Sequence, residues 1–244
     1  MSAPLQLPGT PIGKALRQLF EELARRIQPR SPLRIILAGG MAAHLYVGKR
    51  VTLAIDAEFC ARVLIPQDLV VEAEGIGPLY FDTNYNPKFA LMHEDCRADA
   101  ILVDIDVPNI ELRILAPVDL AVSKIARWAD VDQEDIADLV RAGLATAAAI
   151  QQRAEAALIG YIGNLTDVRA RIESAVELAA QVEAEPMKIP IAARQPSASA
   201  PFIRQPVRGT PEERIRRALE LGRRGQLLRK LNPNARSKRD TDPR

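Results

Sequence analysis

Apolar residues near the start of the chain recur every three or four positions, a spacing that predicts an amphipathic helix. The residues with this spacing are Leu16, Leu19, Phe20, Leu23 and Ile27. We place the helix over 11–27, because proline suits the first turn of a helix and Pro29 and Pro32 stop its continuation. Residues 33–38 form a short apolar run followed by two glycines and helix-favouring residues. That order predicts a strand, a glycine turn and a second helix over 41–47.

Residues 51–59 alternate between apolar and more polar side chains, which predicts one continuous strand. One side carries Val51, Leu53, Ile55, Ala57 and Phe59, and the other carries Thr52, Ala54, Asp56 and Glu58. The acidic residues of this strand therefore face one place. Similar runs predict further strands over 79–83, 89–92, 100–103 and 111–115.

Helical spacing dominates the chain after Pro117 and predicts helices over 119–128, 133–143, 147–159 and 167–184. Asn164 or Thr166 is a suitable N-cap for the last of them. The predicted fold class is α+β, with a mixed β-sheet flanked by helices, a helical C-terminal half and a basic tail. We expect a core over 1–145, a helical extension over 146–185, a proline-rich linker over 186–210 and a basic helical tail over 211–244.

The composition fits a chain that is globular for most of its 244 residues, with 48% hydrophobic and 26% charged residues. These fractions exclude wholesale disorder and a small disulfide-held protein. The two cysteines have no zinc-site spacing. Because no apolar run approaches the roughly 20 residues of a spanning helix and the first residues lack a secretory pattern, we expect a cytoplasmic protein with no membrane contact.

The net charge of +2 conceals a division of the chain into an acidic body and a basic arm. Residues 202–244 contain 13 Lys and Arg against 5 Asp and Glu, a charge of +8, which leaves −6 for the preceding residues. Such an arm can neutralise the phosphates of RNA or DNA. It can equally be a solvated tail, because Phe202 at its edge is its only aromatic residue for base stacking.

Gly39 and Gly40, at the start of a predicted helix, would let backbone amides approach a phosphate group closely. The acidic strand face over 51–59 follows within a few residues, and carboxylates are the hard oxygen ligands that Mg²⁺ prefers. A phosphoryl or nucleotidyl transfer site needs two carboxylates that alternate on a strand and a third from a neighbour. The local pattern thus favours a site for magnesium and phosphates.

These residues resemble the bacterial minimal nucleotidyltransferases of the polymerase-beta superfamily, in the AbiEii-like branch that includes toxins of toxin–antitoxin systems. The family signature is Gly-Gly or Gly-Ser, a helix, then Arg-x-Thr-x-Asp-h-Asp, where h is hydrophobic. A Lys on a helix and an acidic Asp-h-x-Asp-h follow later. The matching elements are Ala38-Gly39-Gly40, Arg50-Val-Thr52-Leu-Ala54-Ile-Asp56, Lys124 within 119–127, and Asp135-Ile-Ala-Asp138-Leu. The resemblance covers about residues 33–143.

The resemblance implies an enzyme that transfers a nucleoside monophosphate from an NTP to a hydroxyl on RNA, notably tRNA, or on protein, with Mg²⁺ as cofactor. It implies that Gly39 and Gly40 hold phosphates together with Arg50 and Thr52. Lys124 would contact the triphosphate, and Asp135 would orient that lysine or pair with it. A cognate antitoxin is the implied partner.

The sequence departs from the signature at Ala54, where the family has the first carboxylate of Asp-h-Asp. A methyl group cannot bind metal, so Asp56 is left with Glu58 one strand step further on. Three explanations stay open: an inactivating change made so that a toxic enzyme could be produced, a natural pseudoenzyme, or a shifted pair of Asp56 and Glu58. The first is favoured because Arg50 and Thr52 remain in register.

The third carboxylate is expected in the polar stretch 91–99, with Asp99 and Asp95 as first choices. That stretch can instead be a solvated loop, in which His93 is a hydrogen-bonding residue rather than a base. His44 is expected to be packed or at the surface rather than a ligand. The alternative for the whole chain is a nucleotide- or nucleic-acid-binding module without catalysis.

Overall fold

The first helix begins and ends where the sequence predicts. The computed structural model describes residues 4–185, and α1 spans Pro11–Ile27. The Thr10 side chain accepts a hydrogen bond from the Gly13 N–H, which satisfies one of the free amides of the first turn. Arg25 and Arg26 in the last turn complement the negative end of the helix. Leu16, Leu19, Phe20 and Leu23 of its apolar face are fully buried, and Ile27 at its end is partly buried.

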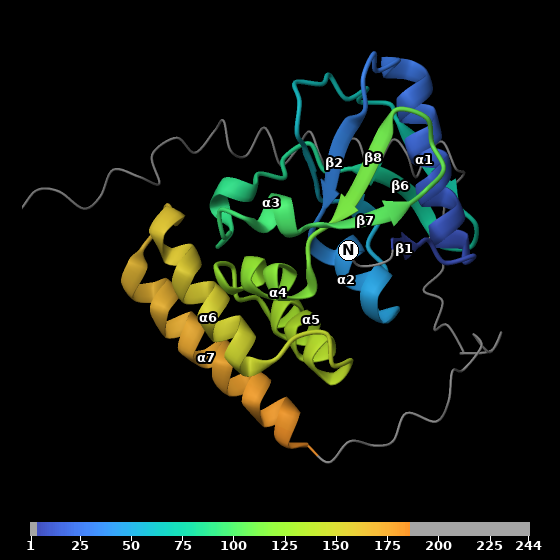
Figure 1. Ribbon diagram of the computed structural model, residues 1–244. Helices are drawn as coiled ribbons and strands as arrows, with labels where there is room; N and C mark the ends of the chain where they lie inside the picture. Colours follow the sequence, from blue (N-terminus) through green and yellow to red (C-terminus); the bar gives the residue numbers. More distant parts are fainter. Residues whose placement is uncertain (1–3, 186–244) are drawn as a thin grey trace, which may run out of the picture. The chain divides into compact units, whose positions relative to one another are not determined.

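A five-stranded mixed sheet carries the centre of the fold, in the order β1-β7-β8-β2-β4. Its strands are β1 (Leu5–Gln6), β2 (Leu33–Leu37), β4 (Ala57–Phe59), β7 (Ile101–Asp104) and β8 (Ile110–Ile114). Strand β2 lies between β8 and β4, parallel to β8 and antiparallel to β4. Figure 1 shows β2 and β8 side by side, with β2 leading into α2 (Gly39–Val47).

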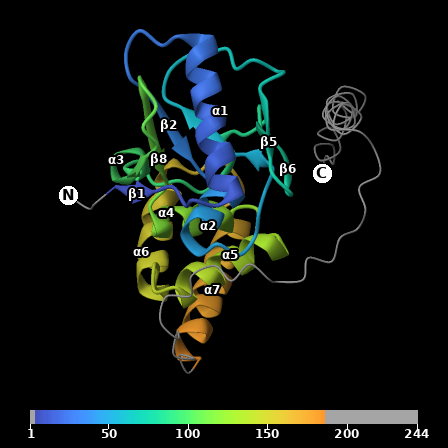
Figure 2. The ribbon, with the colours of Figure 1, turned by 90° about the vertical axis from the view of Figure 1, so that its right-hand side faces the viewer.

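A second sheet of three strands has the order β3-β6-β5. It consists of β3 (Ala54–Ile55), β5 (Val70–Ala73) and β6 (Gly77–Phe81). Helix α1 packs against β5 and β6, as the side view in Figure 2 shows. Phe20 of α1 and Phe81 of β6 meet edge to face, with ring centroids 5.6 Å apart, which is a favoured aromatic geometry.

The predicted continuous strand over 51–59 is wrong, because the chain changes sheets at Asp56. Before this residue β3 pairs with β6, and after it β4 pairs with β2. The Asp56 carbonyl accepts a hydrogen bond from the Ala38 N–H at 2.9 Å, which ties the changeover to the end of β2. Periodicity reports which side chains alternate but not which neighbour a strand pairs with, so this division was not visible in the sequence.

Two further predictions about strands fail in the polar middle of the chain. The strand expected over 89–92 is absent; a short 3-10 turn, η1 (Pro87–Phe89), precedes residues without regular secondary structure, and the Phe89 side chain is exposed. Within the polar stretch, α3 (Cys96–Asp99) forms one helical turn. Strands β1 and β5 were not predicted, and β1, with only two residues, is too short for a periodic signal.

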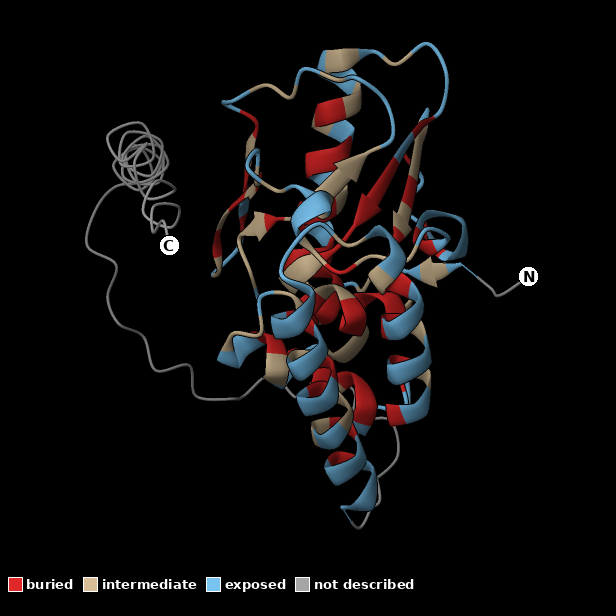
Figure 3. Cartoon of the chain, turned by 90° about the vertical axis from the view of Figure 1, so that its left-hand side faces the viewer, coloured by how far each residue is buried: buried red, intermediate tan, exposed pale blue. Residues whose placement is uncertain are grey.

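The C-terminal half is helical, as predicted. It contains α4 (Pro117–Ile125), α5 (Asp130–Arg141), α6 (Ala147–Ala157), the 3-10 turn η2 (Leu158–Gly160) and α7 (Leu165–Ala184). Asn164 caps α7 by accepting hydrogen bonds from the Thr166 and Asp167 N–H groups. Helices α6 and α7 pack side by side and, as Figure 3 shows, turn buried residues inward and exposed residues outward. The α+β class is therefore confirmed.

No helix among residues 4–185 is long and apolar enough to cross a membrane. The predicted linker over 186–210 and the basic tail over 211–244 lie outside the described residues.

Candidate functional site

The carboxylate of Asp56 lies directly against Gly39 at the start of α2. Gly39 has a φ of +59°, and a Cβ built on it would lie 1.7 Å from Asp56 Oδ2. Only glycine tolerates both this backbone conformation and this approach. Ala38, the N-cap residue, makes no side-chain cap, and the backbone of Gly40 hydrogen-bonds the Asp56 carboxylate instead. Asp56 thus occupies the positive end of α2.

Gly40 is covered by two other residues of the predicted signature. A Cβ at position 40 would lie 3.0 Å from Arg50 Nη2 and 3.1 Å from Thr52 Cγ2. Thr52 Oγ1 also donates to the Ala54 carbonyl at 3.1 Å, which fixes the segment that leads into β3. The structure therefore brings together the glycine pair, Arg50, Thr52 and Asp56, which lie on α2 and in the segment that follows it.

Asp82 is the second carboxylate at this place. Because β3 and β6 are parallel and Ile55 pairs with Phe81, Asp56 and Asp82 follow as neighbours at the same ends of the two strands. The Asp82 N–H donates to the Ile55 carbonyl at 2.9 Å. Burial and the negative charge of Asp82 raise the pKa of Asp56, and they outweigh Lys124, Arg127 and the Gly40 hydrogen bond, which lower it.

Two buried carboxylates on α5 hold the basic groups beside Asp56. The Lys124 Nζ lies 2.7 Å from Asp135 Oδ2 and 3.7 Å from Asp132 Oδ1, and all three side chains are nearly inaccessible to solvent. Arg50 reaches the same Asp135 from the other side, with Nη2 donating to Oδ2 at 2.8 Å. The predicted pairing of Lys124 with Asp135 is thus present, in a network that also includes Arg50.

Arg127 and Asp132 form the outer part of this network. The guanidinium donates from Nε and Nη2 to the two oxygens of Asp132, each at 2.6 Å. Burial tends to raise the pKa of Asp132, but the bonds from Arg127 and the charge of Lys124 hold it below its ordinary value. Three cations and two carboxylates therefore give the surroundings of Asp56 and Asp82 a net positive charge.

The donor set fits one magnesium ion better than two. Among residues 4–185 no three His, Cys, Asp or Glu side chains gather closely enough to hold a metal ion. Asp56 and Asp82 are two carboxylates, and Mg²⁺ commonly binds one or two carboxylates together with substrate phosphates. The carboxylate that a pair of ions would additionally need is the one that Ala54 lacks.

Comparison with known families agrees with this geometry. Residues 14–181 match the family described as "Nucleotidyltransferase of unknown function (DUF6036)". The match spans more than half of the chain and includes every residue of the site described above. The chain belongs to this nucleotidyltransferase family. Searches of curated proteins and of solved structures found no match.

Glu58, the alternative metal ligand, is engaged elsewhere in this member of the family. Its carboxylate accepts bonds from Arg97 Nε at 2.9 Å and Nη2 at 2.5 Å. Glu58 lies on β4, beyond the point where the chain changes sheets, so it does not continue the face that Asp56 presents. The structure therefore pairs Asp56 with Asp82 rather than with Glu58.

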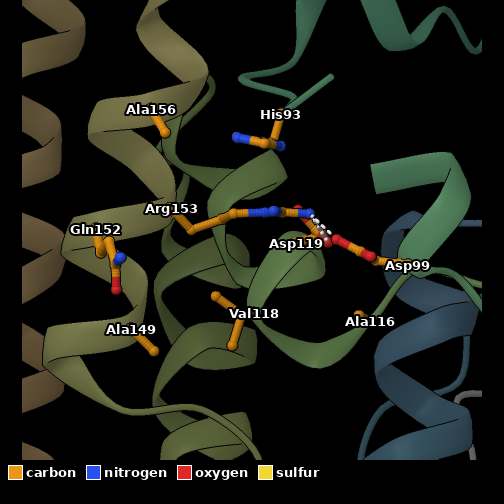
Figure 4. Close-up of a pocket in the computed structure, with 9 residues that line it drawn as sticks. All are labelled: His93, Asp99, Ala116, Val118, Asp119, Ala149, Gln152, Arg153 and Ala156. Atoms are coloured by element: carbon orange, nitrogen blue, oxygen red, sulfur yellow. Dashed lines mark hydrogen bonds and ion pairs between the residues drawn. The ribbon is translucent and has the colours of Figure 1, made fainter. Parts of the chain in front are cut away.

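Asp99, the first choice for the third carboxylate, lines a pocket of about 470 Å³ together with residues of α4 and α6. Figure 4 shows Arg153 of α6 pointing toward Asp119 and Asp99. Arg153 bonds Asp119 at 2.7 and 2.9 Å and Asp99 at 2.6 Å. The structure thus places Asp99 in a bridge between α3, α4 and α6. Asp95, the other choice, has an exposed side chain near His93.

The two histidines take the positions that the sequence predicts. His93 Nδ1 accepts a hydrogen bond from the Asp95 N–H at 3.1 Å, as a loop hydrogen-bonding residue. His44 on α2 is partly buried, and burial lowers its pKa.

Sequence reasoning missed Asp82 and Arg127. Asp82 ends the predicted strand 79–83, but only the parallel pairing of β3 with β6 shows that it adjoins Asp56. An acidic residue at the end of a strand next to the signature strand is the signal that could have found it. Arg127 belongs to the same predicted helix as Lys124, three positions on, where helix geometry brings side chains close together.

Proposed function

We propose that the chain binds a nucleoside triphosphate with one Mg²⁺ beside Gly39, Asp56 and Asp82, and that transfer of the nucleoside monophosphate to a hydroxyl acceptor is impaired by Ala54. The observation that carries this proposal is the contact of the Asp56 carboxylate with Gly39, with Asp82 alongside and basic groups opposite. The family adds the reaction class.

In this proposal the acidic residues would bind the metal ion and the basic residues would face the phosphates. Asp56 and Asp82 would hold the ion, which when bound supplies a positive charge that offsets the negative charge of the phosphates. Arg50, Lys124 and Arg127 would screen the triphosphate from the other side. Gly40 would leave the space that Arg50 and Thr52 occupy, because a side chain at position 40 would crowd both of them.

The reaction requires little covalent chemistry from the protein. The acceptor hydroxyl oxygen forms a bond to the α-phosphorus, and the bond from that phosphorus to the bridging oxygen breaks. Pyrophosphate leaves with the electron pair, and the hydroxyl proton passes to a carboxylate or to water. Catalysis then rests on positioning and on charge at the transferred group. Ala54 removes one carboxylate from this arrangement, so turnover should fall by several powers of ten.

Binding by the full chain tests the proposal. Isothermal titration with ATP, GTP, CTP and UTP in the presence of Mg²⁺ should show binding of at least one of them, weakened at least tenfold by Asp56→Ala and by Asp82→Ala. Asp68→Ala is the matched control, because Asp68 is an exposed acid paired with Arg26 on α1. Absence of binding to all four, or equal binding by all variants, would reject the proposal.

The acceptor and the biological role stay predictions from the resemblance. RNA, notably tRNA, or protein is the expected acceptor, and a toxin neutralised by an antitoxin is the expected role. If the chain binds Mg²⁺ and NTP but stays inert after position 54 is restored, the alternative of a nucleotide-binding module without catalysis is favoured. Deletion of 202–244 tests the arm, because a tail that contacts phosphates would make RNA binding more dependent on salt.

A further inference from the structure

The corner between α4 and α5 holds one guanidinium rigidly at the surface. Arg127 follows the end of α4, and Trp128 turns the chain with a φ of +55°, so that α5 begins at Asp130. Asp132 in the first turn of α5 accepts the Ala129 N–H at 3.1 Å in addition to both bonds from Arg127. A carboxylate held by its own helix start and almost fully buried is a fixed anchor for the arginine.

This anchor leaves one face of the arginine available. Asp132 accepts hydrogen bonds from Nε and Nη2 of Arg127. Within residues 4–185 the third nitrogen of this arginine, Nη1, has no hydrogen-bond partner. The side chain is 68% exposed, whereas that of Asp132 is 2% exposed. Such a group is a cation already placed in one orientation, and a guanidinium suits phosphate oxygens well.

Arg127 differs from the other basic residues near Asp56. The two whose charges act on Asp56 are Lys124 and Arg127. The Lys124 side chain is 4% exposed and is already paired with Asp135 and Asp132. Contact between Lys124 and a phosphate would require this buried pair to open, whereas Arg127 can meet a phosphate without losing its anchor.

We propose that Arg127, positioned by Asp132, contacts the β- or γ-phosphate of the bound nucleotide through Nη1, and that Lys124 supports the site from the interior without touching the ligand. This inference rests on the proposed function, since it assigns the residue that the triphosphate meets. Asp132 is then a positioning residue. The residue in direct contact with the phosphate is Arg127, not Lys124.

The purely structural alternative is that Arg127 only joins the end of α4 to the start of α5. The two roles differ in their dependence on phosphate number. A structural arginine affects the binding of nucleoside mono-, di- and triphosphates equally, through the shape of the site. A contact with the β- or γ-phosphate weakens triphosphate binding and leaves monophosphate binding nearly unchanged.

The test measures Mg²⁺-dependent binding of the mono-, di- and triphosphates of the tightest-binding nucleoside to the full chain and its variants. Arg127→Gln should weaken triphosphate binding at least tenfold and monophosphate binding less than twofold. Arg127→Lys should restore part of the loss, because it keeps the charge but not the double anchor. Arg25→Gln is the control, since Arg25 is equally exposed, at 69%, and also paired with a carboxylate.

The outcomes separate this inference from the proposed function. If the unchanged chain binds triphosphate and Arg127→Gln binds it equally well, the role of Arg127 is rejected while the proposed function stands. An equal loss for all three phosphate lengths assigns Arg127 to structure and also rejects the contact. If the unchanged chain binds no nucleotide, both proposals fail. Thermal unfolding of each variant distinguishes a loss of binding from a loss of folding.

Discussion

Asp56 and Gly39 are in direct contact, and this contact makes glycine obligatory at the start of α2. The Asp56 Oδ2 atom occupies the space that a side chain at position 39 would need. The same carboxylate serves the amide end of α2, where Ala38 offers no cap. The contact therefore gives a physical reason why the glycine pair and the acidic strand occur together: the Asp56 carboxylate needs the space that a glycine leaves free.

Gly39→Ala should weaken both folding and nucleotide binding. The new Cβ would clash with Asp56, and the positive φ adds backbone strain, for a total of about 3 kcal/mol in the free energy of unfolding. Gly48→Ala is a matched control, because Gly48 has a φ of +70° but nothing within 4 Å of a new Cβ. It should cost about 1 kcal/mol and leave nucleotide affinity unchanged. Urea unfolding and titration with Mg²⁺ and NTP measure the two effects; equal costs for both variants would contradict the contact.

Ala54→Asp should add the missing carboxylate. Position 54 lies two residues before Asp56 in extended chain, so its side chain projects to the same side. We expect tighter Mg²⁺ binding and a rise of several powers of ten in transfer of α-labelled NTP to total RNA or protein. Growth arrest on expression would accompany this gain if the product is toxic. Ala54→Asn is the control, because it has nearly the same shape without the charge. If the aspartate and asparagine variants have equal transfer, metal binding at position 54 is not the missing function.

The helices and the signature residues were predictable because both depend on local sequence. Leu16 and Phe20 repeat with the helical period, and Gly39, Arg50, Thr52 and Asp56 lie within one short stretch. The partner of Asp56 was not predictable, because Asp82 reaches it only through the pairing of two strands that lie far apart in the chain. Asp99 was favoured for its polar surroundings, but polarity there reflects a bridge to Arg153 on a distant helix.

The titration of Asp56 should lower the stability of the fold as the pH rises, whereas that of an acidic residue with a lowered pKa raises it. Burial and Asp82 raise its pKa above the ordinary value of 3.8, so the folded chain holds the proton more tightly than the unfolded chain. The resulting stabilisation is fully present below this ordinary value and is lost as the pH rises through the raised pKa. An asparagine does not titrate, so the Asp56→Asn variant does not lose stability in this way. Its free energy of unfolding relative to the unchanged chain should therefore rise between pH 3.8 and the raised pKa of Asp56, and stay constant above it.

Urea unfolding at a series of pH values checks this prediction. Asp68→Asn is a control of opposite sign, because the bond from Arg26 lowers the pKa of Asp68. That variant should lose stability relative to the unchanged chain as the pH rises toward 3.8. A difference for Asp56→Asn that is independent of pH would show that Asp56 titrates alike in the folded and unfolded chains.

Removing the negative charge of Asp135 should destabilise the chain more than removing the positive charge of Lys124. Asp135→Asn leaves Lys124 buried with only the more distant Asp132, at 3.7 Å, and should cost about 3–5 kcal/mol. Lys124→Met leaves Asp135 with Arg50 and Asp132 with Arg127, so neither carboxylate is left alone, and its cost should be about 1 kcal/mol. The double variant should be more stable than Asp135→Asn alone, because it removes the uncompensated ammonium group.

Urea unfolding of the three variants at neutral pH measures these differences. Equal costs for the two single changes would mean that Arg50 and Arg127 do not compensate the carboxylates, and that Lys124 alone neutralises them.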